Sequence, residues 1–280
     1  MDEETFDVVV VGAGAAGLTA ALVLARARRR VAVVDAGEPR NGPAAHVQGF
    51  LSRDGTPPAE LLAAGRAEVV GYGGELVEGR VTRIEPGFVV RLAGGRTFGA
   101  RRVLVATGLR DELPDIAGMR ERWGDDVLHC PYCHGWEERD RPIGVVGGLD
   151  PDRALHLALL LPQWSPDVVF FPDTASLTGR ERDQLAARGV QVAEGRVTRL
   201  VVHDDVLRGV ELAGGRVVPR EVVFVAPYFV RLPVLVEPGR AALQVPLLRD
   251  AGGEPRGAQV AGPGALVVTR HLQQMCPHGV

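Results

Sequence analysis

The sequence predicts an α/β protein made of two related units, each with a strand–helix–strand core and an inserted β-meander. Three observations support this. A glycine-rich turn follows an apolar strand at 6–11, a second apolar strand at 141–148 enters another glycine turn, and two short strings recur in the same order further along. The chain has 280 residues, enough for two domains of about 130 residues with buried cores.

The first unit opens with the pattern of a dinucleotide-binding turn. The strand leads into GAGAAG at 12–17, a helical stretch, and a second strand that ends at Asp35. In this pattern the first glycine allows a tight turn, the second lets a pyrophosphate approach the helix, and the third lets helix and strand pack closely. The acid can accept a hydrogen bond from a ribose hydroxyl. The candidate cofactor-binding residues are therefore Gly12, Gly14, Ala15, Ala16, Gly17 and Asp35.

Two strings indicate an internal repeat. EGRVTRI starts at Glu78 and EGRVTRL at Glu194, while LAGGR starts at Leu92 and again at Leu212. The shifts are 116 and 120 residues. Their common order and similar shifts predict two homologous Rossmann-like units.

The second glycine turn is altered where a nucleotide would bind. It reads GGLDPD, with Leu149 and Asp152 in place of the second and third glycines. A leucine and two acids are unfavourable for the approach of an anionic pyrophosphate. No arginine pair directly follows the next strand to hold a 2′-phosphate. The second unit is therefore expected to keep the fold without the nucleotide site.

Composition excludes two classes of partner. The net charge is −3, there is no lysine, and the arginines are scattered, so no nucleic-acid surface is predicted. The acidic N-terminus does not resemble a signal peptide, and no apolar run of about 18 residues could span a membrane. We expect a cytoplasmic protein with no membrane segment.

The segment HCPYCHGWE at 129–137 contains two of the three cysteines. A C-x-x-C followed by histidine fits a redox disulfide, half of a zinc site, or a c-type haem attachment sequence. Zinc needs four ligands, and Cys276 with His278 lies in an irregular tail; haem attachment would leave the glycine turn unexplained. A cysteine at a helix start is favoured as thiolate. A redox pair is thus the preferred interpretation, with no metal site.

GAGAAG, CPYC and the strand VLVATG at 103–108 together resemble the low-molecular-weight thioredoxin reductase family, over roughly residues 5–235. The resemblance implies two domains of the three-layer ββα type, with the FAD domain discontinuous. The FAD domain would comprise 1–113 and 228–280, and an NAD(P)-binding-like domain carrying the cysteines would occupy 114–227. A homodimer is also expected.

The same resemblance implies further FAD contacts. VLVATG matches the family's second flavin-contacting strand, which points to Thr107 and Gly108. The segment 39–50 matches the loop that approaches the flavin, which adds Asn41 and His46.

The cysteine motif departs from the reductase form. Reductases commonly have an acid directly after the second cysteine, and this chain has His134. With the altered second turn, the pattern is similar to the dithiol oxidases of holomycin and gliotoxin biosynthesis. The resemblance implies that Cys133 exchanges electrons with flavin, Cys130 reacts with substrate sulfur, and His134 deprotonates the incoming thiol. The substrate would be a small-molecule or protein dithiol, with molecular oxygen as acceptor.

The tail after Val234 lacks the A-x-G-D turn and capping helix with which the family closes its flavin site. It resembles a truncated or frame-shifted end and predicts incomplete FAD occupancy. Two other functions stay open: an NADPH-dependent thioredoxin reductase and a decayed, non-catalytic flavoprotein paralogue.

Overall fold

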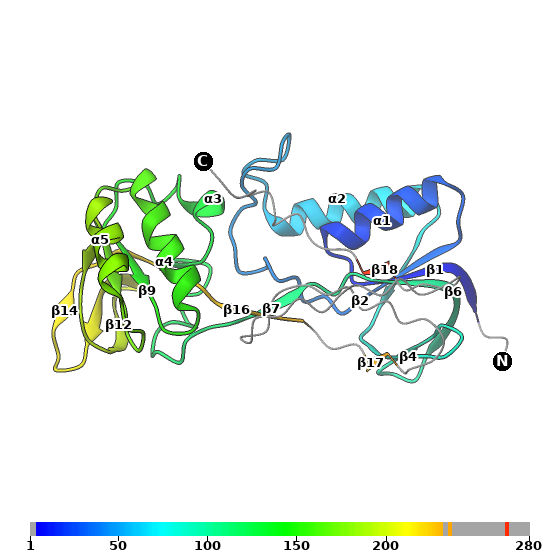
Figure 1. The fold of residues 1–280 in the computed structure, drawn as a ribbon. Coiled ribbons are helices and arrows are strands. Elements are labelled where there is room, and N and C mark those ends of the chain that lie inside the picture. The colour runs from blue at the N-terminus through cyan, green and yellow to red at the C-terminus, as the bar shows by residue number, and fades with distance from the viewer. Residues whose placement is uncertain (1–3, 232–234, 237–266, 269–280) are drawn as a thin grey trace. The chain divides into compact units, whose positions relative to one another are not determined.

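The computed structural model describes residues 4–231, 235–236 and 267–268 of the chain (Figure 1). The chain folds into two compact units. Unit 1 comprises Met1–Gly42, Ala59–Leu109 and Arg231–Val280, and unit 2 comprises Pro43–Pro58 and Arg110–Val230. The tail, in which the sequence shows no flavin-site turn and no capping helix, lies outside the described residues, apart from 235–236 and 267–268.

Unit 1 is built on a mixed sheet in the order β17-β4-β5-β6-β1-β2-β3, with β18 also paired to β6. Strands β3, β2, β1 and β6 are parallel, whereas β4, β5 and β6 form an antiparallel meander. The strands are β1 Thr5–Val11, β2 Val31–Asp35, β3 Glu75–Glu78, β4 Val81–Glu85, β5 Val89–Leu92, β6 Thr97–Val105, β17 Leu235–Val236 and β18 Val267–Val268. The helices are α1 Ala15–Arg26 and α2 Pro58–Gly71.

Alternation along β1 separates the two cores of this unit. Val9 and Val11 pack with the meander residues Ile84 and Phe98, whereas Val10 packs with residues of the helices. Successive side chains of a strand point to opposite faces, so an unbroken apolar run fits a strand that is covered on both sides. Figure 1 shows α1 and α2 on one face of the central strands and β4 on the other. This is the three-layer arrangement expected from the sequence.

Unit 2 has a parallel sheet in the order β11-β10-β9-β15-β8 and a separate antiparallel sheet in the order β12-β13-β14. Its strands are β8 Val127–Leu128, β9 Ile143–Val146, β10 Val168–Phe171, β11 Gln191–Val192, β12 Val197–His203, β13 Val206–Leu212, β14 Val217–Val218 and β15 Val222–Val225. Its helices are α3 Pro131–His134, α4 Pro151–Leu160 and α5 Gly179–Ala187, with a 3-10 turn at Leu161–Gln163. Strands β7 Leu109–Glu112 and β16 Tyr228–Arg231 pair with each other where the chain passes between the units.

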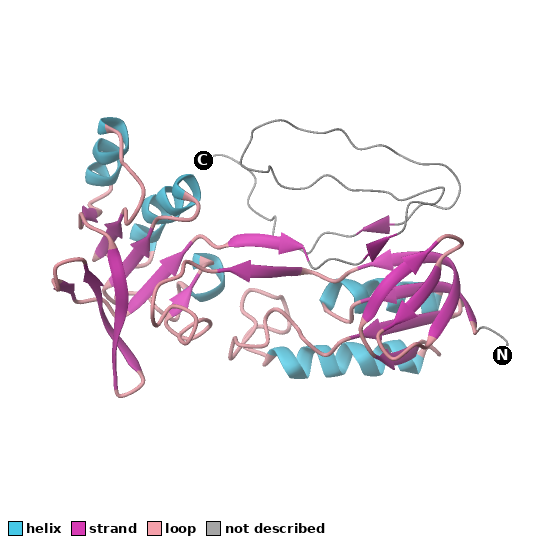
Figure 2. Ribbon diagram, turned by 90° about the horizontal axis from the view of Figure 1, so that it is seen from below, coloured by secondary structure: helices cyan, strands magenta, loops and turns pink. Residues whose placement is uncertain are grey.

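The order of helices and strands along the chain confirms the internal repeat. Figure 2 shows that both units contain helices and strands. Strand, helix, strand, helix and strand run from β1 to β3 and again from β9 to β11, and a meander follows each time. The EGRVTR strings lead into β4 and β12, and the LAGGR strings form the next hairpins. One difference separates the copies: β6 is continuous over nine residues, whereas Pro219 lies between β14 and β15. Proline cannot donate to a strand ladder, which explains the break.

Among the described helices, none combines the length and apolar character that crossing a membrane requires.

Candidate functional site

Two glycines of the first turn are required by the protein's own packing. Gly12 has φ +105°, and a Cβ there would lie 2.5 Å from the carbonyl oxygen of Ala106. A Cβ at Gly17 would lie 1.9 Å from the carbonyl oxygen of Gly12. Any side chain at either position would therefore force the backbone apart. These two residues hold β1, α1 and the end of β6 close together.

Gly14 differs from its two neighbours. It is the N-cap of α1 with φ −71° and ψ 176°, and no side chain caps the helix there. A Cβ built on Gly14 would meet no atom within 4 Å. The first turn, which includes Ala15 and Ala16, has no acidic residue. Open space in front of the first amides of a helix suits an anionic group, so the turn fits the pyrophosphate of FAD.

Asp35 ends β2 beside this turn. Its Oδ1 accepts a hydrogen bond from the Ala13 amide at 3.1 Å, and its Oδ2 accepts one from Arg66 at 2.7 Å. A cavity of about 290 Å³ adjoins the carboxylate. Its lining residues are Ala13, Val33, Asp35, Gly37, Arg66, Leu76, Val77 and Glu78. The acid at the end of the second strand binds the ribose in dinucleotide folds, so this cavity matches the adenosine end of FAD.

The other predicted cofactor residues fall into two groups. Thr107 lies beside the glycine turn, since a Cβ at Gly12 would be 3.3 Å from its Cα, and Gly108 follows with φ +74°. Asn41 and His46 are both exposed in the loop after β2. The boundary between the two units falls between Gly42 and Pro43, so Asn41 belongs to unit 1 and His46 to unit 2. Their contacts with flavin stay predictions.

The cysteine motif surrounds a single helical turn in unit 2. Cys130 is the N-cap of α3 in an extended conformation, and Pro131 is its first helical residue. The amides of Cys133 and His134 donate to the Cys130 carbonyl at 3.1 and 3.2 Å. Proline is favoured at the first helical position because its φ is already helical and no amide is lost. Both cysteines are half-buried, so the turn presents two partly accessible thiols three residues apart.

Aromatic side chains support and flank this turn. A Cβ at Gly135 would lie 2.9 Å from the ring of Trp164, so α3 sits directly on that indole. Tyr132 packs edge-on against the same ring at a centroid distance of 5.4 Å. Trp136 is 67% exposed, and the guanidinium of Arg139 lies 4.2 Å from its ring centroid.

His134 is half-buried beside Cys130. Its Nδ1 is buried and has no hydrogen-bond partner within the part of the chain that the structure describes. Burial lowers the pKa of this imidazole below its usual value, while the Cys130 backbone and the Glu137 carboxylate act in the opposite direction. A lowered pKa keeps the ring neutral at pH 7, and a neutral imidazole can accept a proton.

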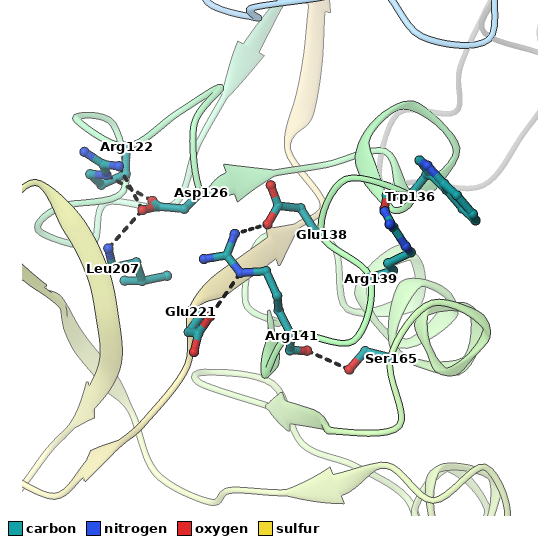
Figure 3. Close-up of polar contacts among 9 residues, drawn as sticks. All are labelled: Arg122, Asp126, Trp136, Glu138, Arg139, Arg141, Ser165, Leu207 and Glu221. Atoms are coloured by element: carbon teal, nitrogen blue, oxygen red, sulfur yellow. Dashed lines mark hydrogen bonds and ion pairs between the residues drawn. The ribbon is translucent and has the colours of Figure 1, made fainter.

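A polar network fixes the segment that follows α3 (Figure 3). Arg141 donates to Glu221 at 3.0 Å and pairs with Glu138, and Ser165 donates to the Arg141 carbonyl at 2.6 Å. Burial is the main cause that raises the pKa of Glu138. Sequence reasoning missed this network because its members come from segments up to 80 residues apart.

In the altered glycine turn of unit 2, an aspartate carboxylate caps the helix that follows. Asp150 is the N-cap of α4, and its carboxylate accepts a hydrogen bond from the Arg153 amide at 3.1 Å. Asp152 adds a second acid in the first helical turn. Tyr228 donates to the Leu149 carbonyl across the turn. A carboxylate thus already occupies the helix N-terminus that a pyrophosphate would need.

Among the residues that the structure describes, no group of three or more His, Cys, Asp or Glu side chains is arranged to hold a metal ion. Cys276 and His278, the ligands considered for a zinc site, lie outside those residues.

The glycine turn and the cysteine pair lie within a region that is similar to known proteins. The model of the family described as pyridine nucleotide-disulphide oxidoreductase matches residues 6–150, a range that contains the first glycine turn and both cysteines. The thioredoxin reductase sirT of Leptosphaeria maculans is 33% identical over 182 residues, which are 60% of this chain and 56% of that protein. A thioredoxin reductase of Listeria monocytogenes is 31% identical over 156 residues, 53% of this chain and 48% of that protein. The chain spans about half the length of the curated relatives it matches.

Solved structures extend the similarity over more of the chain. The crystal structure of HlmI is 52% identical with a TM-score of 0.84, and the match covers 95% of this chain and 84% of that one. An oxidoreductase from Agrobacterium tumefaciens is 42% identical with a TM-score of 0.75, covering 80% of this chain and 76% of that one.

Proposed function

Because this chain belongs to the pyridine nucleotide-disulphide oxidoreductase family, we propose that it is an FAD-dependent dithiol oxidase acting through a disulfide between Cys130 and Cys133. The substrate is a small-molecule or peptide dithiol, and molecular oxygen is the final electron acceptor. FAD is the cofactor that the family supports, and the open turn at Gly14 with Asp35 fits its pyrophosphate and ribose. The proposal includes a homodimer in the cytoplasm.

The contrast between the two glycine turns carries this proposal. The first has open space at Gly14 and no acid in the first helical turn. The second is capped by the carboxylate of Asp150, with Asp152 beside it. In α5, the helix after β10, Arg182 is ion-paired with Glu194. Electrons are therefore expected to enter from a dithiol and not from NADPH.

The thiol chemistry requires one base and one enzyme disulfide. His134 takes the proton of the first substrate thiol, and the thiolate attacks Sγ of Cys130, which breaks the enzyme disulfide and releases Cys133 as thiolate. The second substrate thiol gives its proton to the Cys133 thiolate and attacks the substrate sulfur of the mixed disulfide, which closes the substrate disulfide and releases the Cys130 thiolate. Two electrons and two protons stay with the enzyme. Bound FAD would accept these two electrons from the dithiol pair and pass them to oxygen, giving hydrogen peroxide.

One anaerobic experiment tests which donor reduces the enzyme. With the FAD-loaded full chain, NADPH should leave the flavin absorbance unchanged for many minutes, because Asp150 and Asp152 oppose dinucleotide binding. Dithiothreitol should bleach the flavin, and readmitted oxygen should restore the colour and yield hydrogen peroxide. Absorbance and peroxide assay are the two readouts. Rapid bleaching by NADPH would favour the thioredoxin reductase alternative, and failure of both donors would favour the non-catalytic paralogue.

The role of His134 has a pH signature. Removing the base in His134→Ala should slow dithiol oxidation about 100-fold at pH 7, the usual scale of general base catalysis. The difference in rate between His134→Ala and the native protein should decrease above about pH 9, where the substrate thiol ionises without a base. In the native protein the rate should fall only below about pH 6.5, because burial lowers the pKa of the ring and the neutral form persists to lower pH.

His156→Ala provides the matched control, since His156 is exposed on α4. Its profile should coincide with that of the native protein. A His134→Ala defect of equal size at pH 7 and pH 9 would assign this residue a structural part in place of a base.

A further inference from the structure

The ion pair at the adenosine cavity includes a residue that no sequence pattern singled out. Arg66 lies on α2, 31 residues after Asp35, and donates to its Oδ2 at 2.7 Å. The preceding residue, Gly65, packs close to Leu18 of α1, since a Cβ there would lie 3.1 Å from Leu18 Cδ1. This contact lets α2 approach α1 closely. The guanidinium is thereby placed at the end of β2, on the cavity wall.

Both groups keep hydrogen-bonding capacity for a ligand. Each carboxylate oxygen has two acceptor positions, and within the described residues each oxygen of Asp35 accepts one bond, from Ala13 or from Arg66. A guanidinium has five donors, and toward the described residues Arg66 uses one of them, in its bond to Asp35. The pair can therefore receive ribose hydroxyls without breaking. Side-chain exposure of 36% for Arg66 and 25% for Asp35 leaves both accessible from the cavity.

The cavity lining also includes groups that can pack against a flat ring. Leu76, which is 38% exposed on β3, contributes an aliphatic side chain to the lining, and Arg66 contributes a planar cation. Guanidinium groups stack favourably on aromatic faces, and adenine is such a ring. An ammonium group would lack this planar surface.

We propose that Arg66 is a positioning residue for the adenosine half of FAD: it orients the Asp35 carboxylate toward the ribose and covers one face of the adenine. The inference rests on FAD as the cofactor of the proposed function, and it concerns cofactor affinity alone. Its test is therefore a binding measurement, which is independent of whether the loaded protein oxidises dithiols.

Titration of the flavin-free full chain, followed by quenching of flavin fluorescence, measures the effect. Arg66→Ala should raise the Kd for FAD about tenfold. FMN, which lacks adenosine, should bind the variant and the native protein equally. AMP, which lacks flavin, should compete with FAD on the native protein and about tenfold less well on the variant. Arg66→Lys, which keeps the charge but loses the planar fork, should fall between the two.

Arg80→Ala is the matched control, because Arg80 pairs with exposed Glu38 and does not line the cavity. Its FAD affinity should equal that of the native protein. An unchanged or tighter FAD affinity in Arg66→Ala would overturn the proposal, as would an equal loss for FAD and FMN. If circular dichroism shows that Arg66→Ala does not fold, Arg66→Lys decides: FAD and AMP affinities equal to those of the native protein overturn the proposal.

Discussion

Cys130→Ser and Cys133→Ser are each expected to abolish dithiol oxidation, lowering turnover roughly 10³-fold or more, as loss of a covalent nucleophile does. Serine cannot form the disulfide that accepts the two electrons, so neither variant can complete a cycle. Both cysteines are half-buried in a single helical turn, and the small change from sulfur to oxygen should leave α3 folded. Peroxide release in the presence of dithiothreitol measures the loss.

The two variants should differ in how fast their remaining cysteine forms a mixed disulfide. In Cys133→Ser, the remaining Cys130 thiol should form a stable mixed disulfide with an activated aromatic disulfide reagent, visible as a mass increase and as released chromophore. In Cys130→Ser, the same adduct at Cys133 should form more slowly, because Cys130 is the proposed substrate-facing thiol. Cys276→Ser is the matched control and should retain full turnover. Equal activity of the Cys130→Ser variant and the native protein would remove the disulfide from the mechanism.

Gly14→Val should prevent FAD binding without unfolding the protein, raising the Kd for FAD at least about 100-fold. The backbone at Gly14, with φ −71°, is open to any residue, and a Cβ there meets no atom within 4 Å. The valine side chain would instead fill the space where a pyrophosphate approaches the α1 amides. Flavin absorbance relative to protein absorbance after gel filtration gives the occupancy, and thermal melting reports the fold.

Gly17→Ala is the comparison variant for Gly14→Val, because it should destabilise the fold and not simply block the FAD site. Its Cβ would lie 1.9 Å from the Gly12 carbonyl oxygen, so this smaller substitution should destabilise the protein by about 1–3 kcal/mol or more. Gly14→Val should melt near the native temperature, and Gly17→Ala should melt well below it. Full FAD occupancy in Gly14→Val would show that the turn does not bind the pyrophosphate.

Much of the fold could be predicted from local sequence. The apolar runs of β1 and β2, the glycine turn and the repeated EGRVTR and LAGGR strings indicated two βαβ units with meanders, and the structure confirms these units. The reason is that a strand or a tight turn restricts residues that are neighbours in the chain. Gly12 with φ +105° is such a restriction, and it is visible in the sequence because few other residues adopt that conformation.

The candidate site was only partly predictable for the same reason. The glycine turn and Asp35 follow from spacing within one βαβ unit, whereas the bond from Arg66 to Asp35 depends on how α2 packs against α1. The tie between Arg141 and Glu221 joins residues 80 positions apart. Such contacts produce no recognisable sequence pattern. The local sequence around Arg66 or Arg141 does not differ from that around many surface arginines, so it cannot identify the partner. Residues that are neighbours in the chain thus determine the two glycine turns and the cysteine pair, and these could be predicted from the sequence. The ion pairs around them join residues that are far apart in the chain, and only tertiary packing decides which residues pair.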